Sequence, residues 1–221
     1  MVILTLRERL EDNPADTDFM GIKLPVSQAM TRADTTMTKT YEDETTFLKA
    51  IAEHPKIAEL HQTVRESLLD GIKQATLKDA ELQTHAGQAF RLGRWFIRND
   101  DLPFLELIAT AVGIIVVISA SGGVVAAALT AKIAGFVSST WKIWRKGAVL
   151  NKDQLLVLSV LDSRESQQID RIADALNLAQ VSFNLGQLTA ILNSLTMIEL
   201  YDGTEVELVR LDEKGWRCLR V

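Results

Sequence analysis

The chain has 221 residues, 47% of them hydrophobic, which is enough apolar material for one large domain or two small ones. Its net charge of −5 excludes a general binder of polyanions, and its single cysteine, Cys218, excludes an intrachain disulfide and favours a reducing compartment. The first residues, MVILTLRERLEDN, lack the basic start and the long apolar run of a secretory signal.

The first hundred residues are predicted to change from irregular to helical structure near residue 40. Residues 1–40 have no sustained hydrophobic period, so we expect an irregular segment there. Residues 41–100 are predicted to form amphipathic helices, with Pro55 interrupting one helix or opening the next. One long helix bent near Gly71 and two or three shorter helices both fit the spacing of three and four between apolar residues, which are Ile57, Leu60, Val64, Leu68, Ile72 and Ala75.

Residues 101–147 are predicted to be an apolar helical hairpin or a transmembrane segment, with Asp101 as the cap of its first helix. Their centre, LIATAVGIIVVISASGGVVAAALTA, is an uncharged run of 25 residues, 107–131. As one helix this run would measure about 37 Å, which exceeds the roughly 30 Å of a hydrocarbon core. Basic residues flank both ends, and the positive-inside rule then favours a hairpin with a turn at residues 119–123. The alternative is a buried hairpin in a soluble domain.

Two groups of residues in this segment are candidate sites. Small residues every four positions would form a stripe on one helix face, where another helix can approach closely; they are Ser119, Gly123, Ala127, Ala131, Gly135 and Ser139. Tryptophans beside basic residues would form a membrane-interface belt; these residues are Trp95, Trp141, Lys142, Trp144, Arg145 and Lys146. Glu106 and Lys132 would lie near the same boundary of the bilayer.

The composition of residues 102–141, rich in Ala, Gly and Val with a small-residue turn, resembles that of the apolar hairpin in pore-forming colicin domains. This resemblance implies a segment that is soluble until it inserts into a bilayer.

Residues 148–221 are predicted to form a further domain of three helices followed by short strands. Asn151 and Ser166 are candidate caps of the first two helices, the third is expected over residues 182–196, and Asp202-Gly203 is a hairpin turn. The segments IADALNL, LNSLTMIELYDG and LDEKGWRCL, at residues 172–178, 192–203 and 211–219, resemble the winged-helix family.

The winged-helix resemblance implies a third helix that enters the major groove of DNA and a wing that contacts the backbone. Here the third helix has no lysine or arginine, and the wing carries Asp202, Glu205 and Glu207. Phosphate neutralisation, which dominates DNA affinity, is therefore missing, and nucleic acid is not an expected partner. We expect instead a protein-interaction surface at Asn184, Gln187, Asn193 and Tyr201.

No catalytic or metal-binding motif is found. His54, His61 and His85 have no cysteine or carboxylate partners at metal-ligand spacing, and neither a phosphate loop nor a nucleophile elbow is present. We expect no enzyme activity, no cofactor and no metal.

The sequence thus predicts a mainly α protein with a helical N-terminal region, an apolar helical hairpin and a C-terminal winged-helix-like domain with a small β wing. The function hypothesis is a membrane-associated, self-associating protein, a membrane-perturbing effector of the toxin or cell-defence type. Its expected partners are a lipid bilayer, further copies of itself and another protein bound through the N-terminal helices or the winged helix. The expected location is a cell membrane with the soluble parts in the cytoplasm, or the cytoplasm if the apolar segment is a buried core. The alternative is a soluble or membrane-tethered winged-helix regulator that binds DNA, with the apolar segment as its oligomer core.

Overall fold

The structure is a computed structural model that describes residues 39–85 and 95–219, with the side chains of residues 77–85 left aside. All of these residues belong to the unit that spans residues 36–221. The irregular segment predicted for residues 1–40 therefore lies outside the described residues, except for Lys39 and Thr40, which form part of a strand.

The N-terminal part begins and ends with two paired strands. Strand β1 (Lys39–Tyr41) pairs antiparallel with β2 (Trp95–Ile97). Three helices lie between them in the sequence: α1 (Glu44–Ala52), α2 (Pro55–Ala58) and α3 (Gln62–His85). Pro55 is the first residue of α2, which confirms that proline opens a helix here.

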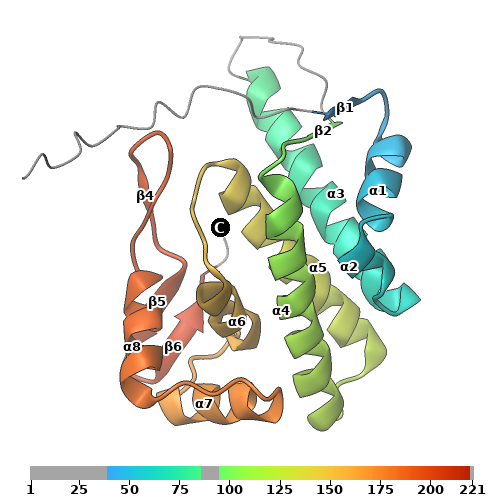
Figure 1. The fold of residues 1–221 in the computed structure, drawn as a ribbon. Coiled ribbons are helices and arrows are strands. Elements are labelled where there is room, and N and C mark those ends of the chain that lie inside the picture. The colour runs from blue at the N-terminus through green and yellow to red at the C-terminus, as the bar shows by residue number, and fades with distance from the viewer. Residues whose placement is uncertain (1–38, 86–94, 220–221) are drawn as a thin grey trace, which may run out of the picture. The chain divides into compact units, whose positions relative to one another are not determined.

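The apolar segment is a helical hairpin, as the sequence favoured. Helix α4 (Asp101–Ser121) and helix α5 (Ala126–Arg145) lie side by side and are joined by a turn at residues 122–125 (Figure 1). Gly123 takes a left-handed conformation in this turn, with φ of 65°, which favours glycine. The turn falls later than the predicted residues 119–123, because α4 continues to Ser121.

Helix α4 has neighbours on both sides of the sequence. It packs against α2, α3 and α5, and also against α6 (Lys152–Val160) and α7 (Ile169–Leu178). A helix covered by several neighbours is apolar around most of its circumference. Its buried apolar residues are Phe104, Leu105, Ile108, Ala109, Ala111, Val112, Ile114 and Ile115.

The C-terminal part has three helices followed by two antiparallel hairpins. Helix α8 (Leu185–Ser194) follows α6 and α7 and packs against both. The strands that follow are β3 (Ile198–Glu199), β4 (Glu205–Val206), β5 (Val209–Asp212) and β6 (Gly215–Cys218), paired β3 with β4 and β5 with β6. The predicted Asp202-Gly203 turn joins β3 to β4, and Gly203 has a φ of 77°.

The caps of the C-terminal helices agree with the sequence in part. Asn151 caps α6 in a reciprocal capping box with Gln154, as predicted for Asn151. The prediction that Ser166 caps α7 is wrong, because Gln168 holds that position and Ser166 instead donates a hydrogen bond to Asp212. Helix α8 is shorter than predicted, since a second capping box at Asn184 starts it at residue 185.

Helix α3 crosses α5 closely at Gly71. A Cβ atom placed on Gly71 would lie 2.7 Å from the carbonyl oxygen of Ala134 and 2.8 Å from Cβ of Val137. Both atoms belong to the framework of α5 and cannot move aside cheaply. Gly71 is therefore needed for close packing, and α3 continues through it as one helix of 24 residues.

We predict that Gly71→Ala lowers the free energy of unfolding by about 1–3 kcal/mol, because overpacking outweighs the gain in helix propensity. The matched control is Gly113→Ala in α4, where a Cβ atom would meet nothing within 4 Å. This control should be neutral or stabilising by up to about 1 kcal/mol. Urea unfolding of both variants checks the prediction, and equal effects would contradict it.

Candidate functional site

The hairpin tip, defined as residues 120–128, is exposed at every position and carries no charge. Val125 is 70% exposed, and Val117, one turn before the end of α4, is 43% exposed. Exposed apolar surface of this kind is typical of a contact site for a protein or a membrane. The tip is therefore the candidate functional site.

The nearest charged residues along the two arms lie at different distances from the tip. Glu106 is 15 residues before the end of α4, about 22 Å, whereas Lys132 is six residues after the start of α5, about 9 Å. The prediction that these two residues share one bilayer boundary is therefore wrong for this hairpin. Burial lowers the pKa of the half-buried Lys132 ammonium, and the carboxylate of Asp162 opposes that shift.

The tryptophans of the predicted membrane belt belong to the interior of this fold. Trp141 is fully buried, and Trp95 is buried against Phe47, with ring centroids 5.2 Å apart. Trp144 stacks on Phe104 at 4.2 Å. The belt prediction is thus corrected for these three residues, because their large rings fill the core.

The basic members of the predicted belt lie at the end of α5 that is distant from the tip. Arg145 is mostly buried and donates to a carboxylate, whereas Lys142 is half-buried and Lys146 is exposed. Only the two lysines keep accessible charge, and α5 separates them from the hairpin tip by 20 residues of helix, about 30 Å.

A fully buried carboxylate, Asp101, joins the two ends of the hairpin. It accepts hydrogen bonds of 2.8 Å from Nε1 of Trp144, from Nη1 of Arg145 and from the backbone N–H of Arg98. Arg145 also donates to the carbonyl oxygen of Phe96 at 2.9 Å and lies 4.0 Å from the centroid of its ring. The expected role of Asp101 as a helix cap is wrong, because Asp101 is the first residue of α4 and its carboxylate binds α5 instead.

The predicted stripe of small residues is not one helix face. Ser119 is buried in α4, and Gly123 belongs to the turn, so α5 carries only the last four members. Of these, Ala127, Ala131 and Gly135 are exposed, and Ser139 is half-buried. The part of α5 that contacts α3 closely contains Ala134 and Val137 instead. Self-association through the exposed members stays a prediction.

Two of the four predicted winged-helix surface residues have local structural roles. Asn184 and Gln187 form the capping box of α8, with hydrogen bonds of 2.8 Å and 3.0 Å between side chains and backbone. Asn193 is exposed on α8. Tyr201 is exposed too, but it packs over Gly147, where a Cβ atom would overlap the tyrosine ring. Gly147 has a φ of 99° and follows the cap of α5.

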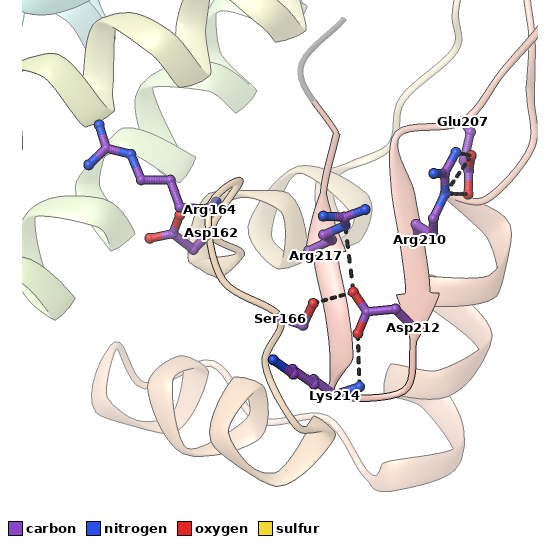
Figure 2. Close-up of polar contacts among 8 residues, drawn as sticks. All are labelled: Asp162, Arg164, Ser166, Glu207, Arg210, Asp212, Lys214 and Arg217. Carbon is purple, nitrogen blue, oxygen red and sulfur yellow. Dashed lines mark hydrogen bonds and ion pairs between the residues drawn. The ribbon is translucent and has the colours of Figure 1, made fainter.

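A polar cluster holds hairpin β5–β6 to the segment before α7 (Figure 2). Asp212 accepts hydrogen bonds from Ser166 Oγ at 2.5 Å and from the backbone N–H of Lys214 at 2.9 Å, and pairs with Arg217 at 3.6 Å. These contacts, the Ser166 bond first, lower the pKa of Asp212. The cluster lines an open cavity of about 630 Å³ in which three basic and three acidic residues balance, completed by Arg164, Glu165 and Glu213.

Two groups with reactive or metal-binding potential, His54 and Cys218, are constrained by the fold. Among the described residues no three of His, Cys, Asp and Glu are grouped to hold a metal ion. His54 faces Glu106 across α2 and α4, with Nε2 3.7 Å from Oε1. Burial raises the pKa of the Cys218 thiol to about 11, which leaves little of the nucleophilic thiolate at neutral pH.

Sequence reasoning located the hairpin but missed which of its residues face water. Val117, Val124 and Val125 are exposed, while their apolar neighbours Ile114 and Ile115 are buried. A uniform run of apolar residues has no period that separates the two groups. The Gly122-Gly123 pair was the one sign of a projecting turn.

One described helix, α4, is long and apolar enough to cross a membrane, and half of its most apolar window is buried inside the fold. A core helix of a soluble protein can be equally long and apolar. No protein-family model, curated protein or solved structure matches the chain. The candidate site therefore rests on exposure, charge and packing alone.

We predict that Asp101→Asn lowers the free energy of unfolding by about 3–5 kcal/mol, because it removes the charge of the carboxylate that pairs with the Arg145 guanidinium in a buried site. The matched control is Asp100→Asn, since Asp100 is exposed and its side chain makes no capping bond. The control should change stability by less than about 0.5 kcal/mol. Chemical denaturation measures both, and a loss below 1 kcal/mol for Asp101→Asn, on the order of an exposed pair, would contradict the prediction.

Proposed function

We propose that the protein binds the surface of lipid bilayers through the hairpin tip. The observation that carries the proposal is the exposure of residues 120–128 without any charge, next to the exposed Val117. Moving apolar surface out of water lowers the free energy by about 25 cal/mol per Å². The composition of α4 adds little, because that helix is half buried.

The chemistry of the tip favours the apolar part of the lipid over its headgroup charge. Electrostatic binding to anionic lipids depends on clusters of lysine and arginine at the membrane surface. The tip has none, the nearest lysine is the single half-buried Lys132, and Lys142 and Lys146 lie at the other end of α5. We therefore propose that bilayers of zwitterionic lipid are sufficient partners and that added salt weakens binding little.

Substitution of one exposed valine tests this proposal. We predict that Val125→Asp lowers the fraction of protein that sediments with phosphatidylcholine vesicles roughly tenfold or more, because a carboxylate resists transfer into the bilayer. The control is Val149→Asp, which alters a valine that is 64% exposed beyond the far end of α5. It should bind as the parent chain does.

Two results would contradict the proposal. One is failure of the parent chain to sediment with the vesicles at any lipid concentration used. The other is an equal loss of binding in both valine variants. Dye release from the same vesicles tests separately whether binding also perturbs the bilayer, as expected for an effector of the toxin or cell-defence type.

The alternative, a DNA-binding regulator, is less well supported by the exposed surface of α8. Gly186, Ala190 and Asn193 are exposed there at helical spacing, Met197 is exposed just after the helix, and none is charged. The adjoining β3–β4 hairpin carries Glu199, Asp202 and Glu205. Such a surface suits a protein partner better than a phosphate backbone.

We predict that the chain binds duplex DNA no more tightly than about 10⁻⁴–10⁻⁶ M at physiological salt, the range of nonspecific binding. Fluorescence anisotropy with a labelled duplex of mixed sequence measures the affinity. Selection of a preferred site from random duplexes, followed by a nanomolar affinity for that site, would revive the regulator hypothesis.

A further inference from the structure

The two arms of the hairpin offer unequal lengths of uncharged helix. On α4 the uncharged run from Leu107 to Ser121 measures about 22 Å, whereas on α5 only residues 126–131, about 9 Å, precede Lys132. A hydrocarbon core is roughly 30 Å thick, and a hairpin crosses it only if both arms do. Helix α5 has 20 residues, but among the described helices only α4 is both long and apolar enough to cross a membrane.

The exposed apolar surface ends at the same level as the short arm. After Lys132 the one exposed residue of α5 is Gly135, whereas Ile133 and Ala134 are buried, and Ala134 and Val137 lie against Gly71 of α3. On α4 the exposed surface of the tip reaches Val117, which is four residues, about 6 Å, from the end of the helix. The boundary set by charge and the boundary set by packing thus agree within one helical turn.

Lys132 is suited to lie at the surface of a leaflet. Its side chain is half-buried, so the ammonium is already partly desolvated in the fold, and this burial lowers its pKa. An ammonium on a flexible stem can reach lipid phosphate while its methylenes stay in the apolar layer. Deeper entry would pull the charge into hydrocarbon.

We infer that the hairpin enters one leaflet only and that Lys132 sets its depth by meeting the lipid phosphates. This inference rests on the proposed membrane binding and adds its geometry. The inserted part is residues 117–131, and the 9 Å available on α5 matches the roughly 5–10 Å reached by interfacial elements. The protein would then lie on the membrane without spanning it, and α4 would keep its contacts with α2, α6 and α7.

Depth-dependent quenching on the full chain tests this inference. A fluorophore is attached at Ala128→Cys in a Cys218→Ser background, and phosphatidylcholine vesicles carry bromine either near the headgroup or near the chain end. The parent should be quenched by the shallow bromine and be extracted by carbonate. Lys132→Leu should shift quenching to the deep bromine and raise the carbonate-resistant fraction roughly tenfold or more.

Two further variants separate charge from folding. Lys132→Arg keeps the charge and should behave as the parent, whereas Lys132→Gln removes the charge but keeps a polar, unbranched side chain and should shift in the direction of Lys132→Leu. Thermal unfolding by circular dichroism selects the variants that retain the fold. A folded Lys132→Leu or Lys132→Gln chain that inserts no deeper than Lys132→Arg overturns the inference.

Measurements on the parent chain separate the proposed membrane binding from the inferred insertion into one leaflet. If it does not bind the vesicles, the proposed function fails and this inference fails with it. If it binds but is quenched by the deep bromine and resists carbonate, membrane binding stands and insertion into a single leaflet is wrong.

Discussion

The buried carboxylate of Asp101 is the contact on which the arrangement of the hairpin depends. It binds the start of α4 to Trp144 and Arg145 at the end of α5, and Arg145 extends the contact to β2 through Phe96. A buried ion pair contributes little net stability, but it tolerates few alternative arrangements, because any other leaves a charge without a partner. The open end of the hairpin is thereby fixed, and the connected end is left to project.

The packing of α4 explains why its composition fits both a core helix and a transmembrane helix. It packs against helices that precede it and helices that follow it, so nearly every face needs an apolar residue. A bilayer imposes the same requirement on a helix that crosses it. The two environments differ where α4 is uncovered, along Pro103, Glu106, Thr110 and Val117 and at the hairpin tip, and the position of this exposed surface is a property of the tertiary structure.

Features set by neighbouring residues were predictable from the sequence. Pro55 opens α2, Asn151 caps α6, and Asp202-Gly203 forms the turn between β3 and β4. Each of these features depends on backbone geometry within a few residues. Features set by distant partners were not. Ser166 donates a hydrogen bond to Asp212, 46 residues away, instead of capping α7. No pattern in the sequence around Ser166 reveals this distant acceptor.

The candidate site shows the same division between local and distant effects. The lack of charge over residues 107–131 was evident in the sequence, and the hairpin followed from the flanking basic residues. The role of Trp141 and Arg145 was not evident, because aromatic and basic residues suit a membrane interface and a buried cluster equally well. The every-fourth-residue stripe failed for a simpler reason, since the turn at Gly123 breaks the helix on which it depended.

The small size of the side chains in the hairpin tip affects solubility. Ala126, Ala127 and Ala128 each expose one methyl group beside two glycines, and valine is the largest residue present. Each methylene left in water costs about 0.8 kcal/mol, so a tip of leucine or phenylalanine would favour aggregation of the free chain far more strongly. An apolar projection built from alanine, glycine and valine is a compromise that a protein can carry through water and still place in a bilayer.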